Sequence, residues 1–277
     1  MTGVQTCALP ILWAKTPLTP MVSCVDAQSR NLSQPAKQLE FDLSNLDLPE
    51  LNRRFETATP QEILAWAIAT VPNLAQMTSF SMGAVTHMLY HELQASIPVI
   101  FLDTLHLFPE TLQTADKAKL VYNLDLHTYR AAASYDDFVT CYGDNLWERD
   151  VERFHHVTKV EPMKRALEEL SVQAWITGRR RDQSTTRQAM PILELDNDGR
   201  LKINPLANWT HKDLWRYTFA NGVLYNPLHD QGYTSIGDRP LTTKVKVGED
   251  ERAGRWRGSV KTRSEEHTSE LQSRPHI

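Results

Sequence analysis

Apolar residues along the chain follow two patterns, one typical of buried strands and the other typical of half-buried helices. Short strand-like runs lie at residues 74–80, 99–102, 124–128 and 172–177, and the run 99–102 (VIFL) has no polar alternation, as expected for a strand covered on both faces. Helical spacing predicts helices over residues 84–96, 109–123 and 160–170. Strands that alternate with helices in this way predict an α/β domain with a parallel sheet.

Cap and turn residues place the remaining elements. Residues 59–62 (TPQE) open a helix with a cap, a first-turn proline and an acid, and residues 210–213 (THKD) resemble a capping box. The sequence Asn197-Asp198-Gly199 predicts a hairpin between two short strands. Residues 131–154 are expected to be irregular. Residues 248–256 (GEDERAGRW) have little apolar support of their own, and we expect them to form a mobile C-terminal flap over the site.

Composition narrows the class of protein. With 277 residues, 41% hydrophobic and 23% charged, the chain is long enough for one large or two small globular domains. No apolar run approaches the length of a membrane span, and a net charge of −4 does not favour nucleic acid, so neither partner is expected. Three scattered cysteines, Cys7, Cys24 and Cys141, predict neither a disulfide framework nor a metal site, which makes the cytoplasm the expected location.

Both chain ends resemble translated sequencing-adapter read-through. The resemblance covers residues 1–11 (MTGVQTCALPI) and 263–277 (RSEEHTSELQSRPHI), and the second segment has no apolar periodicity. We therefore expect residues 1–22 to be foreign or disordered and 263–277 to be a foreign, disordered tail. Between them, residues 23–58 are expected to form an N-terminal extension, and residues 59–262 the main domain.

The turn at residues 79–83 (SFSMG), between a predicted strand and a predicted helix, carries candidate chemistry. A helix start presents unpaired N–H groups and the positive end of the helix dipole. Ser79, Ser81 and Met82 lie in this turn, and Gly83 leaves room for a close backbone approach. The turn therefore predicts a phosphate site, with an ordinary strand-to-helix turn as the alternative. It matches neither GxxxxGK[ST] nor GxGxxG.

A basic loop, residues 178–187 (GRRRDQSTTR), follows the strand predicted at 172–177. Ligands of open α/β sheets bind outside the carboxyl ends of the strands, so this loop and the 79–83 turn should share one edge. Arginine forks match phosphate and sulfate oxygens. The alternative is a solvated basic loop.

An ordered set of blocks makes the chain resemble the phosphoadenylyl-sulfate (PAPS) reductases of assimilatory sulfate reduction. The resemblance covers residues 60–262 and rests on TSFSMGAV, FLDT, LFPET, KVEPMKRAL, TGRRRDQSTTR, NPLANW, YNPLHDQGYTSIGD and GEDERAGRW. It implies an adenine-nucleotide α-hydrolase-like (PP-loop) fold, with residues 79–83 as the phosphate loop. It also implies that Leu102, Asp103 and Thr104 hold adenosine, and that the sulfate and phosphates are bound by Lys159, Arg180, Arg181 and Arg187.

The resemblance further implies a cluster-free enzyme. Relatives that reduce adenylyl sulfate hold an iron–sulfur cluster on two cysteine pairs, but here the matching positions read 153–156 (RFHH) and 237–241 (GDRPL). We therefore expect no cofactor and no metal, and the 3′-phosphorylated substrate, PAPS.

The family's nucleophilic cysteine lies in a Glu-Cys-Gly-Leu-His segment that is expected directly after Thr262, where this sequence has none. Cys141 matches no nucleophile position and is expected to be a buried small hydrophobe. The resemblance implies thioredoxin or glutaredoxin as reductant, and a homodimer stays open. One alternative is a silent nucleotide-binding module. Another is a related ATP-using enzyme, which the absence of an SGGxDS-like loop disfavours.

Overall fold

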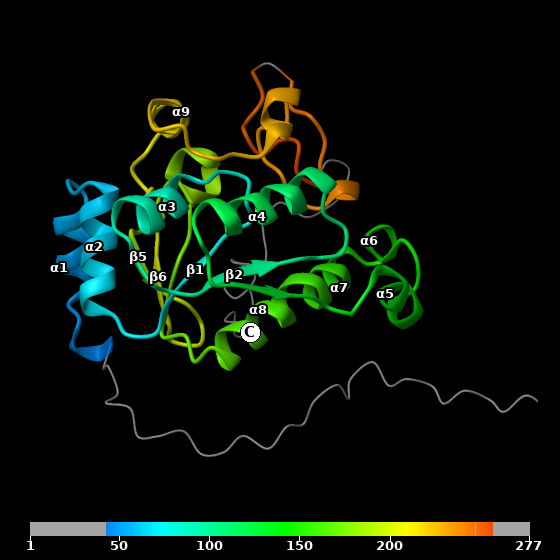
Figure 1. Cartoon of the computed structure of the whole chain (residues 1–277), viewed down its shortest axis with the longest axis horizontal. Helices are drawn as coiled ribbons and strands as arrows, with labels where there is room; N and C mark the ends of the chain where they lie inside the picture. The colour runs from blue at the N-terminus through cyan, green and yellow to red at the C-terminus, as the bar shows by residue number, and fades with distance from the viewer. Residues whose placement is uncertain (1–42, 247, 257–277) are drawn as a thin grey trace, which may run out of the picture. The chain divides into compact units, whose positions relative to one another are not determined.

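One sheet organises the part of the chain that the computed structural model describes, residues 43–246 and 248–256. Its six strands lie in the order β3-β2-β1-β4-β6-β5 (Figure 1). All neighbours are parallel except β5, which pairs with β6 as the predicted antiparallel hairpin. The bounds are β1 Leu74–Met77, β2 Val99–Leu102, β3 Leu126–Tyr129, β4 Ala174–Ile176, β5 Leu193–Leu195 and β6 Leu201–Ile203. The predicted α/β class is confirmed.

The order of the strands fixes where a ligand can bind. β1 pairs with β2 on one side, at Gln76 and Val99, and with β4 on the other, at Leu74 and Ala174. The chain runs outward from β1 through β2 to β3 and then returns to β4. The direction of strand order therefore reverses between β1 and β4, and the crevice at the carboxyl ends of these two strands is the expected binding place.

Successive residues of each strand face opposite sides of the sheet, and both sides are covered by helices. Leu74 and Ile176 belong to a core on the side of α2, α3 and α9, whereas Ala75 and Trp175 pack on the opposite side, together with α8 residues. Figure 1 shows α3 and α4 on one side of the sheet and α8 on the other. These helices are α2 Pro60–Thr70, α3 Ala84–His87, α4 Pro109–Val121, α8 Glu161–Glu169 and α9 His211–Ala220.

Two capping boxes are present, the one predicted at residues 210–213 and a second at the predicted helix start 59–62. In α2, Thr59 Oγ1 accepts from the Glu62 N–H at 3.3 Å, and the Glu62 carboxylate accepts from the Thr59 N–H at 2.7 Å. In α9, Thr210 and Asp213 make the same pair of bonds, at 3.1 and 3.0 Å. Each box satisfies N–H groups that the first helical turn otherwise leaves unpaired.

Residues before the boundary expected at residue 59 also pack into the main core. Helix α1, Leu48–Phe55, follows a short 3₁₀ turn, η1 Leu43–Asn45, and its Phe55 is buried with the residues of α2 and β4. The Asn52 side chain donates to the Leu193 carbonyl and accepts from the Leu193 N–H, both at 2.9 Å. The outer strand β5 is thus covered by α1.

The prediction of irregular structure over residues 131–154 is wrong. Three short helices occupy it: α5 Tyr135–Tyr142, α6 Leu146–Arg149 and α7 Val151–His155. Each helix has too few turns to show a period in the sequence, and the helices are stabilised by burial of Phe138, Leu146 and Phe154 in one shared cluster.

A second difference concerns the helix predicted over residues 84–96. It continues from α3 into a π turn, η2 Met88–Glu92.

The remaining short elements lie in the second half of the chain. They are η3 His156–Val160, η4 Arg181–Gln183, η5 Thr185–Arg187, η6 Pro227–Gln231 and η7 Arg239–Leu241. Among the described residues, no helix has the length and apolar character needed to cross a bilayer. The expected foreign segments, 1–22 and 263–277, lie outside the described residues.

Gly83 should be needed for packing. A Cβ built there would lie 2.3 Å from the Leu224 carbonyl oxygen, which is backbone and has little freedom to move. We expect Gly83→Ala to destabilise the fold by about 1–3 kcal/mol, the usual cost of overpacking. Gly178→Ala is the matched control, because its Cβ would meet only Val85 at 3.8 Å. Urea unfolding measures both variants, and equal midpoints would show that the Leu224 contact does not limit residue 83.

Candidate active site

A cavity of about 260 Å³ opens at the carboxyl ends of β1, β2 and β4. Its walls combine the 79–83 turn, the 178–187 loop, the end of β2, and the C-terminal stretches 234–237 and 251–255. The predicted meeting of the turn and the basic loop at one sheet edge is therefore confirmed. The predicted residues that line the cavity are Ser79, Ser81, Met82, Leu102, Thr104, Lys159, Arg180 and Arg187.

Three predicted residues do not line the cavity. Gly83 lies behind the turn, against Leu224. Asp103 is buried and accepts from Arg130 Nε at 2.7 Å, which holds it toward the end of β3. Arg181 forms an ion pair with Glu56 at 2.7 Å. Asp103 and Arg181 each follow a residue with an extended backbone that lines the cavity, Leu102 and Arg180 respectively. Successive side chains of an extended chain point to opposite sides, so Asp103 and Arg181 point away from the cavity.

The serine turn is held by the segment that follows α9. The Ser81 carbonyl accepts from the Asn226 N–H at 3.0 Å, and Ser81 Oγ lies 3.0 Å from His229 Nε2. Burial lowers the pKa of His229 to about 4, so the imidazole is neutral near pH 7. Phe80 has a left-handed backbone, φ 51°, an unfavourable conformation for a bulky residue that its burial compensates. Packing thus fixes how the turn presents its hydroxyls.

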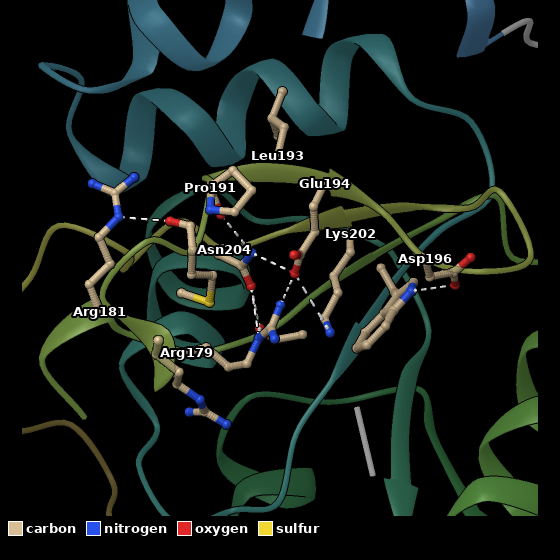
Figure 2. A network of polar contacts seen from close by, with 12 residues as sticks. Arg179, Arg181, Pro191, Leu193, Glu194, Asp196, Lys202 and Asn204 are labelled. Atoms are coloured by element: carbon tan, nitrogen blue, oxygen red, sulfur yellow. Dashed lines mark hydrogen bonds and ion pairs between the residues drawn. The ribbon is translucent and has the colours of Figure 1, made fainter. Parts of the chain in front are cut away.

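Arg179 lines the cavity but is committed to a buried polar network beneath it. Its guanidinium bonds to Glu194, and its Nε donates to Asn204 Oδ1 at 3.1 Å. Figure 2 shows Arg179, Lys202 and Asn204 converging on the Glu194 carboxylate. Burial would raise the pKa of Glu194, but the charges of Arg179 and Lys202 outweigh it and lower that pKa. This network joins the end of β4 to the β5–β6 hairpin.

Arg180 and Arg187 supply buried positive charge in the cavity wall. Arg180 is 1% exposed, and its Nε donates to Asp182 at 2.9 Å, while its Nη2 donates to Glu251 at 2.6 Å. Arg187 is 5% exposed and donates to the Gln183 side chain, which also accepts from the Arg180 N–H. Two short 3₁₀ turns, η4 and η5, therefore direct both guanidiniums inward.

A fully buried carboxylate, Asp238, joins three segments at the cavity. It accepts from Lys159 Nζ at 2.5 Å and from Thr104 Oγ1 at 2.6 Å. Burial would raise the pKa of Asp238, but the charge and hydrogen bond of Lys159, the Thr104 bond and the charge of Arg255 lower it to about 2. Asp238 is therefore ionised near neutral pH and holds Lys159 at the cavity wall.

Three residues of the C-terminal stretch 251–255 line the cavity although the sequence pattern did not predict them as site residues. Glu251, Arg252 and Arg255 all line the cavity. Arg255 lies over Gly237, where a Cβ would be 2.2 Å from its Nη2, and its Nη1 donates to the Ile236 carbonyl at 3.0 Å. The only available signal was the pairing of charged residues with glycines in the block 248–256, which we read as a flap without assigning contacts. The mobility of this segment stays a prediction.

The cavity is strongly biased toward anions. Within the described ranges 43–246 and 248–256, its lining contains one carboxylate, Glu251, and the cations Lys159, Arg179, Arg180, Arg187, Arg252 and Arg255. Charge-assisted bonds to phosphate or sulfate oxygens are strongest in such partly desolvated places. Leu102, Met163 and Ile236 add an apolar wall beside the charges, as an adenosine group would require.

Comparison with known proteins gives the same family. The model of the phosphoadenosine phosphosulfate reductase domain matches residues 74–244. The chain belongs to this family. It is 46% identical over 215 residues to phosphoadenosine phosphosulfate reductase of Saccharomyces cerevisiae, covering 74% of this chain and 82% of that protein. It is 41% identical over 240 residues to a probable phosphoadenosine phosphosulfate reductase of Schizosaccharomyces pombe, covering 84% and 89%.

Solved structures agree on the family and on the fold. PAPS reductase from Candida auris, a phosphate complex, superposes with a TM-score of 0.67 at 38% identity, covering 74% of this chain and 98% of that one. FMN adenylyltransferase of Candida glabrata, with FAD and pyrophosphate, gives a TM-score of 0.51 at 13% identity and shares the fold alone. The predicted PP-loop-like architecture is confirmed.

Asp238→Asn should cost roughly 2–4 kcal/mol of unfolding free energy, because it leaves Lys159 without its buried partner. The exposed pair Asp198–Arg200, at 2.8 Å, supplies the control, and Asp198→Asn should cost under about 1 kcal/mol. The contribution of Asp238 is complete above the unfolded carboxyl pKa of about 3.9 and is lost as pH falls toward the folded value of about 2.

Urea unfolding from pH 7 down to about pH 2.5 tests this, because the gap between wild type and Asp238→Asn should narrow only below about pH 4. Parallel curves across that range would contradict an ionised, ion-paired Asp238.

Proposed function

We propose that this chain is the PAPS-binding body of a thioredoxin-dependent phosphoadenylyl-sulfate reductase of assimilatory sulfate reduction, acting in the cytoplasm. The observation that carries the proposal is the buried cationic cavity at the carboxyl ends of β1 and β4, with its serine turn on one side and Arg180 and Arg187 on the other. A nucleotide with several phosphate and sulfate oxygens matches this charge. Membership of the reductase family selects PAPS among such nucleotides.

Different residues of the cavity are proposed to bind the anionic groups and the adenosine part of the ligand. Ser79 and Ser81 offer hydroxyl donors, and Arg180 and Arg187 offer guanidinium forks, for the phosphate and sulfate oxygens. Leu102 and Thr104 border the apolar part of the cavity, where adenosine is expected to lie. That a related structure from Candida auris is a phosphate complex supports an anion-binding role for the shared fold.

The proposed reaction needs a thiolate, and the described residues that line the cavity include no cysteine. A cysteine thiolate attacks the sulfur of the sulfonyl group, the sulfur–oxygen bond to the nucleotide breaks, and adenosine 3′,5′-bisphosphate leaves with the bonding electron pair. A thiolate of thioredoxin then attacks the enzyme's sulfur, which releases sulfite and leaves a mixed disulfide that the second thioredoxin thiol resolves. The cationic wall stabilises the charge that grows on the leaving phosphate.

Cys141 is not placed for this attack. It is half-buried on α5, not fully buried as expected from sequence, and it does not line the cavity. The sequence contains no cysteine after Cys141. This observation favours the second candidate for the chain as written, a nucleotide-binding module that does not turn over.

We further propose that the enzyme works without an iron–sulfur cluster. At the first of the two positions where cluster-bearing relatives carry cysteine pairs, Phe154 and His155 are fully buried, and His155 packs against Trp256 with ring centroids 4.1 Å apart. At the second, Asp238 holds Lys159. These side chains serve packing and charge, and none is a thiolate.

Arg180→Ala should weaken the binding of adenosine 3′,5′-bisphosphate at least tenfold, because a well-formed charge-assisted hydrogen bond contributes about 1.5–3 kcal/mol. Arg181→Ala is the matched control. Arg181 follows directly in sequence but pairs with Glu56 outside the cavity, so its affinity should stay within about twofold of wild type. Calorimetry on samples of verified fold measures both, and an equal loss in the two variants would remove Arg180 from the site.

Replacing residues 263–277 by Glu-Cys-Gly-Leu-His should switch on thioredoxin-dependent sulfite release from PAPS, whereas the unmodified chain should only bind the nucleotide. A Glu-Ser-Gly-Leu-His version is the control, since a serine hydroxyl cannot form the sulfur–sulfur bond that the cysteine thiolate makes with the sulfonyl group. Sulfite is measured with reduced thioredoxin for all three proteins. Turnover by the serine version would contradict this mechanism, and stoichiometric iron in the anaerobic preparations would contradict the cluster-free proposal.

A further inference from the structure

The anion-binding arginine of the cavity is already occupied by an acid of the same chain. Arg180 is 1% exposed, and its Nη2 donates to Glu251 at 2.6 Å. Glu251 is 15% exposed by its side chain and is the one carboxylate that lines the cavity among residues 43–246 and 248–256. A negative charge therefore stands where the cavity would otherwise present the Arg180 fork to a phosphate.

The two acids on Arg180 differ in their ties to the fold. Asp182 accepts from Arg180 Nε at 2.9 Å, and its other oxygen accepts from the backbone N–H of His211, at the start of α9. Asp182 is thus built into the fold.

Among the described residues, the Glu251 carboxylate accepts a hydrogen bond from Arg180. The backbone carbonyl of Glu251 accepts a separate hydrogen bond from Thr234 Oγ1 at 2.6 Å. The loop is therefore anchored without the carboxylate, so the carboxylate can be displaced while its backbone stays in place.

Two anions cannot share this guanidinium edge without repulsion. A phosphate oxygen that approaches Arg180 Nη2 meets the Glu251 oxygen at hydrogen-bond distance, where the interaction between like charges is strong because little water screens it. The ligand must take over the bond that Glu251 holds, and the lost ion pair is subtracted from its affinity.

We propose that Glu251 is a specificity-determining residue that competes with the ligand's anionic group for Arg180. Only a ligand whose anion outcompetes a carboxylate on that fork binds well, so weakly charged ligands are rejected. The identity of the ligand as a PAPS-like nucleotide rests on the proposed function, but the competition itself depends only on the Arg180–Glu251 pair.

Glu251→Gln tests the competition, because the amide keeps the shape of the side chain and removes its charge. Calorimetry on the full chain with inorganic phosphate, and separately with adenosine 3′,5′-bisphosphate, should show at least about fivefold tighter binding than wild type for one or both probes. Glu249→Gln is the control for net charge, since it lies on the same loop with an exposed side chain whose oxygen accepts from the Lys246 N–H. Its affinity should stay within about twofold.

A double-mutant cycle that combines Glu251→Gln with Arg180→Ala tests whether the gain in affinity depends on Arg180. In an Arg180→Ala background, Glu251→Gln should give a clearly smaller gain than it gives with Arg180 present, because it then removes only the repulsion between Glu251 and the ligand and frees no guanidinium. Unchanged or weaker binding by Glu251→Gln, a gain of the same size with and without Arg180, or an equal gain in Glu249→Gln would each overturn the inference. Tighter phosphate binding by Glu251→Gln, with no nucleotide binding by any variant, would support the competition and reject the proposed function.

Discussion

The active site depends on the ion pair between Asp238 and Lys159, which are 2.5 Å apart at the carboxyl edge of the sheet. Asp238 is fully buried, so its charge is stable only because Lys159 and Thr104 face it. These three residues come from the C-terminal segment, the entry to α8 and the end of β2. One buried carboxylate thus brings together parts of the chain that local propensity would leave independent, and it places Lys159 at the cavity wall.

The same principle governs the arginines. Guanidinium groups as deeply buried as Arg179 and Arg180 carry a large desolvation cost, which carboxylates of the protein offset. Glu194 compensates Arg179 and is part of the hairpin, so that pair belongs to the scaffold. Glu251 compensates Arg180 from the cavity side, so that pair faces the cavity. The cationic site is therefore stabilised by two kinds of carboxylate: Glu194, which is part of the scaffold, and Glu251, which faces the cavity.

The similarity to known proteins gives the class of enzyme, and the geometry of the cavity explains how the fold suits a charged ligand. The family match and the yeast sequences fix the class of enzyme. The fold similarity at 13% identity extends only to the nucleotide-binding architecture. The cavity then explains why this architecture suits a multiply charged nucleotide: the strand order reverses at β1 and β4, and the loops after these two strands carry the serines and arginines.

Local patterns in the sequence were enough to predict the α/β class, the parallel strands, the capped helices and the meeting of two loops at one edge, because hydrophobic period and cap residues are local properties. The sequence also selected Ser81, Lys159, Arg180 and Arg187. The three-dimensional fold was needed to separate Arg180 from Arg181 and Thr104 from Asp103, since adjacent side chains of an extended chain point to opposite sides. Only the tertiary structure brought in Arg255 and Glu251, because their contacts span long sequence separations that no local pattern records.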